Sequence, residues 1–178
     1  MDFYEKTIAT KEIFDGKIIK VRVDTVELPN GNTSTREIVS HPGGVGVVAL
    51  DENNNVYMVR QFRKPLDKVL LEVPAGKLDG GEDPRICGIR ELEEETGMCA
   101  RSFEPLGEFY PSVGFSAETL YLYIARDLYP GKVHPDEDEF LEVEKIPLDT
   151  LVEMVMDGRI KDGKTIVAIL KAKLYLEK

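Results

Sequence analysis

The chain has 178 residues, 42% of them hydrophobic and 31% charged, which is typical of one globular domain with at most a small extension. Its formal net charge of −10 argues against broad nucleic-acid binding, which needs a basic surface. No apolar run approaches the roughly 20 residues that span a bilayer, and the polar start has no signal-peptide core, so we expect a cytoplasmic protein without membrane contact.

The first part of the chain carries strand patterns separated by turn sequences. Extended segments rich in β-branched residues are expected, in chain order, at 17–28, 36–40, 45–50, 56–62 and 69–73. The turn sequence Pro-Asn-Gly-Asn at 29–32 predicts an antiparallel hairpin from the first two strands, and the turn at 51–55 predicts a second hairpin from the next two. His-Pro-Gly-Gly at 41–44 separates the hairpins. We therefore expect an N-terminal β extension, residues 1–40, and a main domain, residues 41–178.

From residue 83 the hydrophobic period becomes that of a helix, which we expect over 84–96. Asp83 suits the N-cap, Pro84 the first helical position and Gly97 the position after the last turn. The residues expected to anchor one face of this helix to a sheet are Ile86, Ile89 and Leu92. Later strands are expected at 103–110, 119–124 and 141–146, a polar loop at 129–138, and helices at 148–156 and 165–176. This order predicts an α+β fold with helices packed on a sheet.

The opposite face of the central helix carries carboxylates. Glu91 and Glu95 are four residues apart and share a face, which Glu94 borders. Such neighbours repel unless a cation lies among them, and oxygen ligands without nearby histidine or cysteine favour magnesium or manganese over zinc. A solvated acidic face is the alternative, in which Arg90 simply pairs with Glu94. The helix by itself leaves both interpretations open.

The spacing around this helix decides between them. Five residues after Gly76 comes Glu82, and seven residues later the run Arg90-Glu91-Leu92-Glu93-Glu94-Glu95-Thr96-Gly97-Met98. This resembles the complete Nudix box, G-x5-E-x7-R-E-U-x-E-E-x-G-U, with U a large aliphatic residue. The resemblance implies an α/β/α sandwich with a mixed sheet, and hydrolysis of a nucleoside diphosphate linked to another moiety.

The resemblance also implies a role for each residue of the box. The metal ligands would be two principal carboxylates, a bordering carboxylate and a backbone carbonyl: Glu91, Glu95, Glu94 and Ala75. They would hold two or three Mg²⁺ ions, for which Mn²⁺ can substitute. Arg90 and Glu82 would orient the loop and the helix, and Gly76 and Gly97 would serve backbone geometry.

Segments outside the box resemble the ADP-ribose pyrophosphatase branch, namely 36–39, 41–45, 59–63, 71–76, 136–143 and 160–165. The branch implies hydrolysis of ADP-ribose to AMP and ribose 5-phosphate. The alternatives are another nucleotide sugar or nucleoside diphosphate derivative, and a catalytically silent binding module. Arg63 and Glu72 are the best candidates for substrate contact and Arg36 a weaker one, although Arg63 could be a solvated arginine at a strand end. The branch also implies a homodimer in which N-terminal strands pack across subunits.

A loop rather than the helix is expected to supply the general base. Glu139 matches the usual base of the branch and Glu137 comes next, so the catalytic candidates are these two and Glu94; a solvated acidic loop tip is the alternative. One departure concerns the substrate. Val113 stands where the branch usually carries a proline associated with ADP-ribose preference, which leaves the nucleotide sugar more open than the chemistry.

A second motif competes with the box. Residues 158–165 satisfy the P-loop pattern G-x-x-x-x-G-K-[ST]. A P-loop needs a strand before it and a parallel sheet after it, whereas an amphipathic segment precedes this one and only 13 residues follow Thr165. We interpret it as a turn between two helices, with Thr165 near a helix start.

Overall fold

The structure is a computed structural model that describes residues 3–132, 134 and 140–178. The chain forms two compact units, the first built from Met1–Gly43 and Tyr110–Thr119 and the second from Gly44–Phe109 and Leu120–Lys178. The segment Tyr110–Thr119 joins the first unit through the backbone of Val39. The Val39 amide donates to the Phe115 carbonyl at 2.8 Å, and the Ala117 amide donates to the Val39 carbonyl at 2.9 Å.

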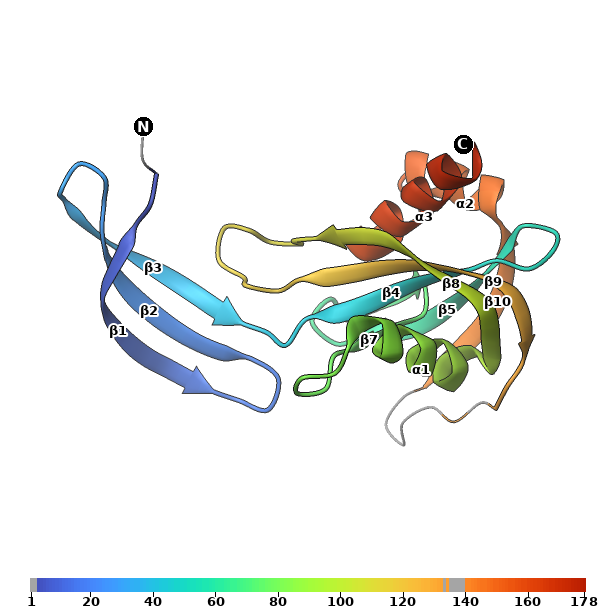
Figure 1. Cartoon of the computed structure of the whole chain (residues 1–178), viewed down its shortest axis with the longest axis horizontal. Helices are drawn as coiled ribbons and strands as arrows, with labels where there is room; N and C mark the ends of the chain where they lie inside the picture. The colour runs from blue at the N-terminus through green and yellow to red at the C-terminus, as the bar shows by residue number, and fades with distance from the viewer. Residues whose placement is uncertain (1–2, 133, 135–139) are drawn as a thin grey trace. The chain divides into compact units, whose positions relative to one another are not determined.

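The first unit contains an antiparallel sheet in the order β1 (Lys6–Asp15), β2 (Lys20–Glu27) and β3 (Thr33–Ser40), labelled in Figure 1. The hairpin expected on either side of 29–32 is confirmed as β2 and β3, with Gly31 in its turn at φ 81°. Strand β1 was not expected. All ten of its residues are exposed, so no alternation between buried and exposed positions marks it in the sequence.

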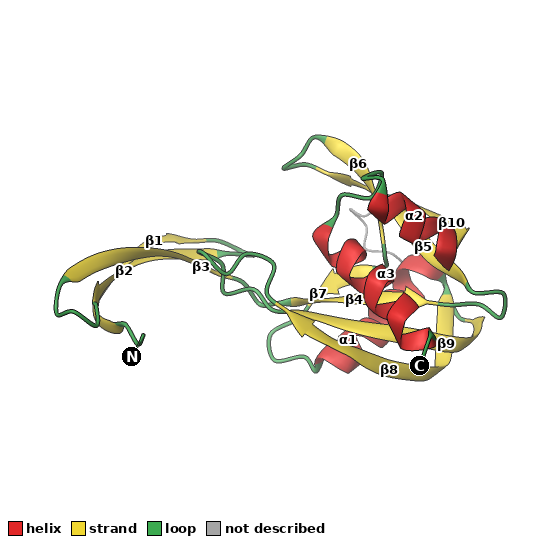
Figure 2. Ribbon diagram, turned by 90° about the horizontal axis from the view of Figure 1, so that it is seen from above, coloured by secondary structure: helices red, strands yellow, loops and turns green. Residues whose placement is uncertain are grey.

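The described residues of the second unit form two sheets and three helices, whose arrangement can be followed in Figures 1 and 2. The larger sheet has the order β7 (Ala75–Lys77), β4 (Gly44–Ala49), β9 (Leu120–Pro130) and β8 (Met98–Phe109), and the smaller one β10 (Leu141–Pro147), β5 (Asn55–Arg63) and β6 (Lys68–Glu72). The larger sheet is mixed because β4 and β9 run parallel while its other pairs are antiparallel. The helices are α1 (Pro84–Thr96), α2 (Leu148–Met156) and α3 (Gly163–Leu176). The expected α+β architecture is confirmed.

The core lies on both faces of β4, whose six residues are all buried. Val45, Val47 and Ala49 share one cluster with residues of α1, whereas Val48 shares another with residues of α2 and α3. Successive strand residues point to opposite faces, so β4 carries a helix layer on each side. This arrangement explains why the stretch reads as a continuous apolar run. Among the described residues, no helix is long and apolar enough to cross a membrane.

The prediction of a hairpin formed by strands 45–50 and 56–62 is wrong. Strands β4 and β5 belong to different sheets and meet only at an isolated bridge between Leu50 and Val56. The turn itself forms, because Asp51 Oδ1 accepts the amides of Asn53 and Asn55, both at 2.9 Å. Strand β4 instead pairs along its length with the parallel strand β9, and its first three residues, Gly44–Gly46, pair with β7 on the other edge.

Helix α1 has the expected ends. Asp83 Oδ1 accepts the amides of Arg85 and Ile86 at 2.9 and 3.2 Å, and Gly97 ends the helix in the left-handed conformation at φ 68°. The Gly97 amide donates to the Glu93 carbonyl at 2.8 Å. The two termini thus satisfy backbone groups that a helix leaves unpaired.

The anchoring face of α1 agrees with the expected one in part, because Leu92 belongs to a buried core cluster and the half-buried Ile89 packs against it. Ile86 is 61% exposed, and of the three expected anchors only Leu92 is fully buried. The buried residues of the helix are Cys87, Gly88, Glu91, Leu92, Glu95 and Thr96. Gly88 permits a close approach to β8, since a Cβ there would lie 2.9 Å from Phe103 Cζ. The metal candidates Glu91 and Glu95 therefore belong to the packed face of the helix, not to a face opposite it.

A cluster of hydrogen bonds around a single carboxylate, that of Glu104, joins β8, β9 and α3. Glu104 accepts hydrogen bonds from Tyr175, from Arg126 Nη2 at 2.8 Å and from Ser102 Oγ at 3.0 Å. These bonds, the one from Tyr175 first, lower the pKa of Glu104 from 4.5 to about 2. Because the folded-state pKa lies below the unfolded one, the resulting stabilisation is complete above pH 4.5 and is lost as the pH falls through about 2.

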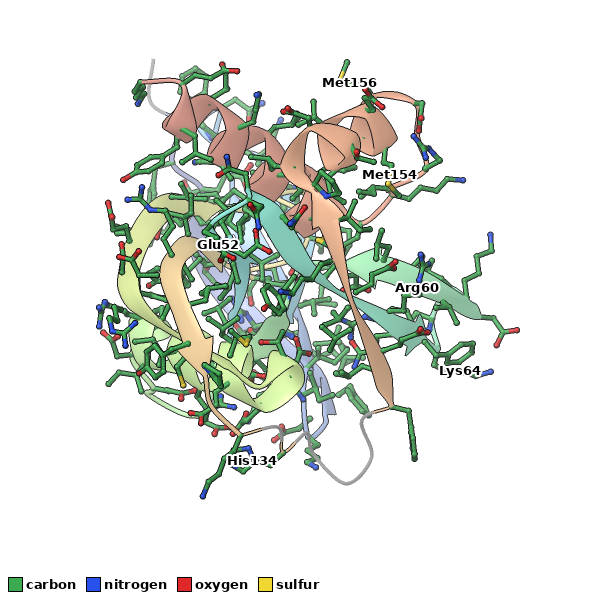
Figure 3. The ribbon with its side chains drawn as sticks, turned by 90° about the vertical axis from the view of Figure 1, so that its right-hand side faces the viewer. Glu52, Arg60, Lys64, His134, Met154 and Met156 are labelled. Carbon is green, nitrogen blue, oxygen red and sulfur yellow. The ribbon has the colours of Figure 1, made fainter. Side chains whose placement is uncertain are left out.

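We expect Glu104→Gln to lower the free energy of unfolding at pH 7, and the difference from wild type to shrink between pH 4.5 and 2. Urea unfolding at stepped pH measures this. Glu52→Gln, at the exposed turn labelled in Figure 3, is the matched control. Equal stability of wild type and Glu104→Gln at pH 7 would rule the effect out.

Candidate active site

The strand–loop–helix segment from β7 to α1 brings the expected metal ligands together. Glu95 is 1% exposed, and its Oε2 accepts the Ala75 amide at 3.0 Å. The Glu91 carboxylate, in a residue 8% exposed, lies directly over Gly76. A Cβ at Gly76 would stand 1.8 Å from Glu91 Oε1, so this position accepts only glycine while the carboxylate stays in place.

Arg90 connects the loop before α1 with the carboxylates on it. Its Nε and Nη2 each donate to Glu82 at 3.1 Å, and its Nη1 donates to Glu91 Oε1 at 2.9 Å and to Glu94 Oε2 at 2.7 Å. The hydrogen bond with Glu82 is the main cause that raises the pKa of Arg90 and lowers that of Glu82. The pair of Arg90 with Glu94, considered above as the plain alternative, is present. This pair accounts for only one of the carboxylates that bond to Arg90, since Glu82 and Glu91 bond to it as well.

The donor chemistry of this segment fits a hard divalent cation. The carboxylates of Glu82, Glu91 and Glu94 surround a single guanidinium, that of Arg90, which leaves a formal excess of negative charge. The Glu95 carboxylate, which is held by the Ala75 amide, adds to this excess. In the part of the chain that the structure describes, no three His, Cys, Asp or Glu side chains converge as a ready metal cluster. Two buried carboxylates next to a backbone segment instead suit an ion that keeps several water or substrate ligands, as Mg²⁺ does.

Arg63 and Glu72 form a bidentate pair at the ends of β5 and β6. Arg63 Nε and Nη2 donate to Glu72 Oε1 and Oε2, both at 2.8 Å. The Glu72 side chain is 1% exposed, whereas that of Arg63 is 38% exposed. The hydrogen bond to Glu72 is the main cause that raises the pKa of Arg63, and the charge of Glu95 adds to it. The guanidinium therefore lies within electrostatic reach of the metal candidates. Figure 3 labels Arg60 and Lys64, which lie on either side of it in the chain.

Sequence reasoning missed Lys164 as part of this site. Its ammonium contacts Glu72 Oε2 and lies 2.9 Å from Asp162 Oδ2. Burial by itself raises the pKa of Glu72, but the bonds from Arg63 and Lys164 outweigh it and lower that pKa. The signal was the Gly-Lys-Thr sequence at 163–165, which suggested a phosphate loop. In the structure these three residues begin α3, and the turn expected between two helices is the segment 157–162 that precedes them.

An open pocket of about 480 Å³ borders the outer side of α1. It is lined by Ile86, Ile89, Arg90, Glu93, Glu94 and His134. The His134 amide donates to the Glu94 carbonyl at 3.3 Å, and Figure 3 labels this histidine near α1. The Glu94 side chain, which is 30% exposed, borders this pocket, whereas Glu91 and Glu95 are not among its lining residues.

The remaining candidates belong to the other compact unit or lie outside the described residues. Arg36 lies in the first unit, where its Nε and Nη2 donate to Glu5 at 2.8 and 2.5 Å. Val113 belongs to the same unit and is 79% exposed. The base candidates Glu137 and Glu139 lie outside the described residues.

Comparisons with known proteins agree with the geometry. A family profile described as NUDIX domain matches residues 40–168, and one described as nucleoside diphosphate sugar hydrolase N-terminal domain matches residues 5–39. The chain is 48% identical to the methanol dehydrogenase activator of Bacillus methanolicus, over 94% of this chain and 91% of the relative. It is 45% identical to the ADP-ribose pyrophosphatase of Bacillus subtilis (strain 168), over 98% and 97%. A crystal structure of an ADP compounds hydrolase shares the fold, with a TM-score of 0.88 over 99% of this chain and 97% of that chain, at 19% identity.

Proposed function

Because this chain belongs to the NUDIX domain family and is a Nudix pyrophosphohydrolase, we propose that it hydrolyses ADP-ribose to AMP and ribose 5-phosphate with the help of Mg²⁺. The observation that carries the proposal is the pair of buried carboxylates, Glu91 and Glu95, held beside Ala75 and Gly76. The nearly full-length similarity to the Bacillus subtilis ADP-ribose pyrophosphatase supports the substrate.

In this proposal the metal ligands are Glu91, Glu95 and the carbonyl of Ala75, with Glu94 as a further ligand that leaves Arg90. They would hold two or three Mg²⁺ ions, and Mn²⁺ would substitute. Such ions, when bound, neutralise the diphosphate and lower the pKa of a bound water. Arg90 stays with Glu82 and keeps the loop at the start of the helix in place.

The protein's own groups bind and orient the reactants. Arg63 would contact a phosphate oxygen, and Glu72 would hold the guanidinium in a fixed plane. Glu139 would accept the proton of the attacking water, with Glu137 and Glu94 as the alternatives. The water oxygen bonds to one phosphorus, the bridging P–O bond breaks, and AMP and ribose 5-phosphate result. Hydrolysis in ¹⁸O-labelled water identifies the phosphorus by the product that carries the label.

The relative named methanol dehydrogenase activator favours a second candidate, an effect on a dehydrogenase protein. One protein can have both functions if its effect on the dehydrogenase depends on hydrolysis of a nucleotide at the carboxylate site. Adding wild type and Glu95→Gln in parallel to a methanol dehydrogenase tests whether any activation depends on the carboxylate site.

The test of the proposed function is a substrate panel with Mg²⁺, scored by chromatography of the products. The panel contains ADP-ribose, ADP-mannose, GDP-mannose, NADH and dinucleoside polyphosphates. We expect ADP-ribose to dominate and to yield AMP. A clear preference for another compound would move the substrate assignment and point to Val113 and Arg63 as its cause. Absence of hydrolysis throughout the panel, with Mg²⁺ and with Mn²⁺, would favour a silent binding module.

We further propose that two copies of the chain form a homodimer through the sheet of the first unit. Ile8, Ile13 and Phe14 of β1 are 50%, 52% and 54% exposed, and these are apolar side chains that a second copy would cover. We expect light scattering after gel filtration to give twice the chain mass of 20.0 kDa, and Phe14→Glu to shift it toward the monomer. Lys11→Glu, on the same exposed strand, is the control. A monomeric wild type at micromolar concentration would exclude this interface.

The two cysteines support our proposal of a cytoplasmic protein. Both are free, and burial is the main cause that raises the pKa of the Cys87 thiol to about 12. Free thiols are usual in reducing compartments.

We propose a small-molecule nucleotide sugar as the binding partner, and neither nucleic acid nor a membrane.

A further inference from the structure

The segment 158–165 matches the pattern of a phosphate loop, yet the structure gives its lysine two carboxylate partners. Lys164 contacts Glu72 on one side and Asp162 on the other, and its side chain is 11% exposed. A lysine that binds phosphate directly would need its ammonium open to the ligand. Lys164 is thus suited to hold a neighbouring carboxylate in place.

That neighbour is Glu72, a carboxylate shared by two cations. Both of its oxygens face Arg63, and Oε2 also receives the Lys164 ammonium. A carboxylate that is 1% exposed has lost its hydration, so its position depends on the charged donors around it. Without Lys164, Glu72 would keep Arg63 as its one cationic partner among these contacts. The Arg63 guanidinium would then be drawn inward to replace the missing charge.

The start of α3 holds Lys164 in place and reaches the metal segment. Asp162 caps α3 by accepting the Thr165 amide at 3.0 Å and the Thr165 hydroxyl at 2.6 Å. The Thr165 hydroxyl oxygen in turn accepts the Val73 amide at 3.0 Å. Val73 directly follows Glu72 and lies two residues before Ala75, whose amide is held by Glu95. One helix start therefore fixes both the side chain of Glu72 and the backbone beside it.

We propose that Lys164 is a positioning residue for substrate binding, which clamps buried Glu72 so that the exposed part of the Arg63 guanidinium faces the diphosphate. The inference rests on the proposed function, because it takes Arg63 as the substrate contact. It adds a residue from the far end of the chain, 92 positions from Glu72, to the diphosphate site.

The test compares Lys164→Met with Lys164→Arg and with the control Lys161→Met, a neighbouring exposed lysine. We expect Lys164→Met to raise the KM for ADP-ribose roughly tenfold with kcat within about threefold, as for the loss of one charged hydrogen bond to a binding group. Lys164→Arg should recover most of the loss, and Lys161→Met should match wild type. A merely structural role would lower the melting temperature and kcat and leave KM unchanged, which would overturn the inference.

A double-mutant cycle asks whether Lys164 acts through Arg63. If it does, adding Lys164→Met to Arg63→Met raises KM no further, and independent, multiplying effects would overturn the inference. Should Lys164→Met fail to fold, Lys164→Gln is measured in the same way. Two measurements separate the proposed function from the role of Lys164. Absence of turnover by wild type with Mg²⁺ would defeat the proposed function.

The role of Lys164 is measured by calorimetric binding of ADP-ribose with Ca²⁺ in place of Mg²⁺, and equal Kd values for wild type and Lys164→Met would defeat it.

Discussion

Gly76→Ala is expected to remove most of the turnover while leaving the fold in place. A Cβ at this position would lie 1.8 Å from Glu91 Oε1 and 1.9 Å from Glu91 Cδ, so the carboxylate must move away. The displaced group is the far end of a flexible side chain, and the backbone can stay where it is. Because a displacement of about 1 Å at a reacting site can cost on the order of 100-fold in rate, we expect kcat/KM to fall by at least that factor.

The matched control for this substitution lies four residues away in the same segment. A Cβ added at Gly80 would meet nothing within 4 Å, so Gly80→Ala should keep wild-type activity. Steady-state kinetics at several Mg²⁺ concentrations, together with thermal melting, measure both variants. If Gly76→Ala stays within a few-fold of Gly80→Ala in kcat/KM, the Glu91 carboxylate has no essential role where the structure places it.

Glu95→Gln is expected to reduce kcat by about 1,000-fold or more, because it removes a charge from a buried ligand position while keeping its shape. The amide oxygen of glutamine can still accept the Ala75 amide, so the local backbone bond survives. Stability should be kept or should rise, because one negative charge leaves a crowded cluster. A loss of activity without a loss of stability would separate a metal role from a structural one.

Two readouts define this experiment. Turnover of the preferred substrate is measured across a Mg²⁺ titration, and melting is measured with and without Mg²⁺, which should stabilise wild type but much less the variant. Glu93→Gln is the control, since Glu93 lies on the same helix at a variable position of the box. Unchanged turnover in Glu95→Gln would lead us to abandon the hydrolase mechanism built on these carboxylates.

The sequence by itself determined the chemistry and its local frame. The spacing from Gly76 to Met98 identified the family, and the ends of α1 at Asp83 and Gly97 followed from capping preferences alone. The β2–β3 hairpin followed from its turn sequence. These features depend on residues that are close in the chain, where backbone geometry leaves few alternatives.

Tertiary structure decided which faces and distant segments meet. The sequence around β4 resembles the first half of a hairpin, but the strand pairs with the parallel strand β9 and, over Gly44–Gly46, with β7. No local sequence pattern encodes that choice. Glu91 and Glu95 are buried on the packed side of α1 because Gly88 and Leu92 approach the sheet there. The Gly-Lys-Thr sequence near Lys164 is compatible locally with a phosphate loop or with a helix start. Lys164 contacts Glu72 only because α3 packs against the sheet, which brings together two charged side chains that lie far apart in the chain.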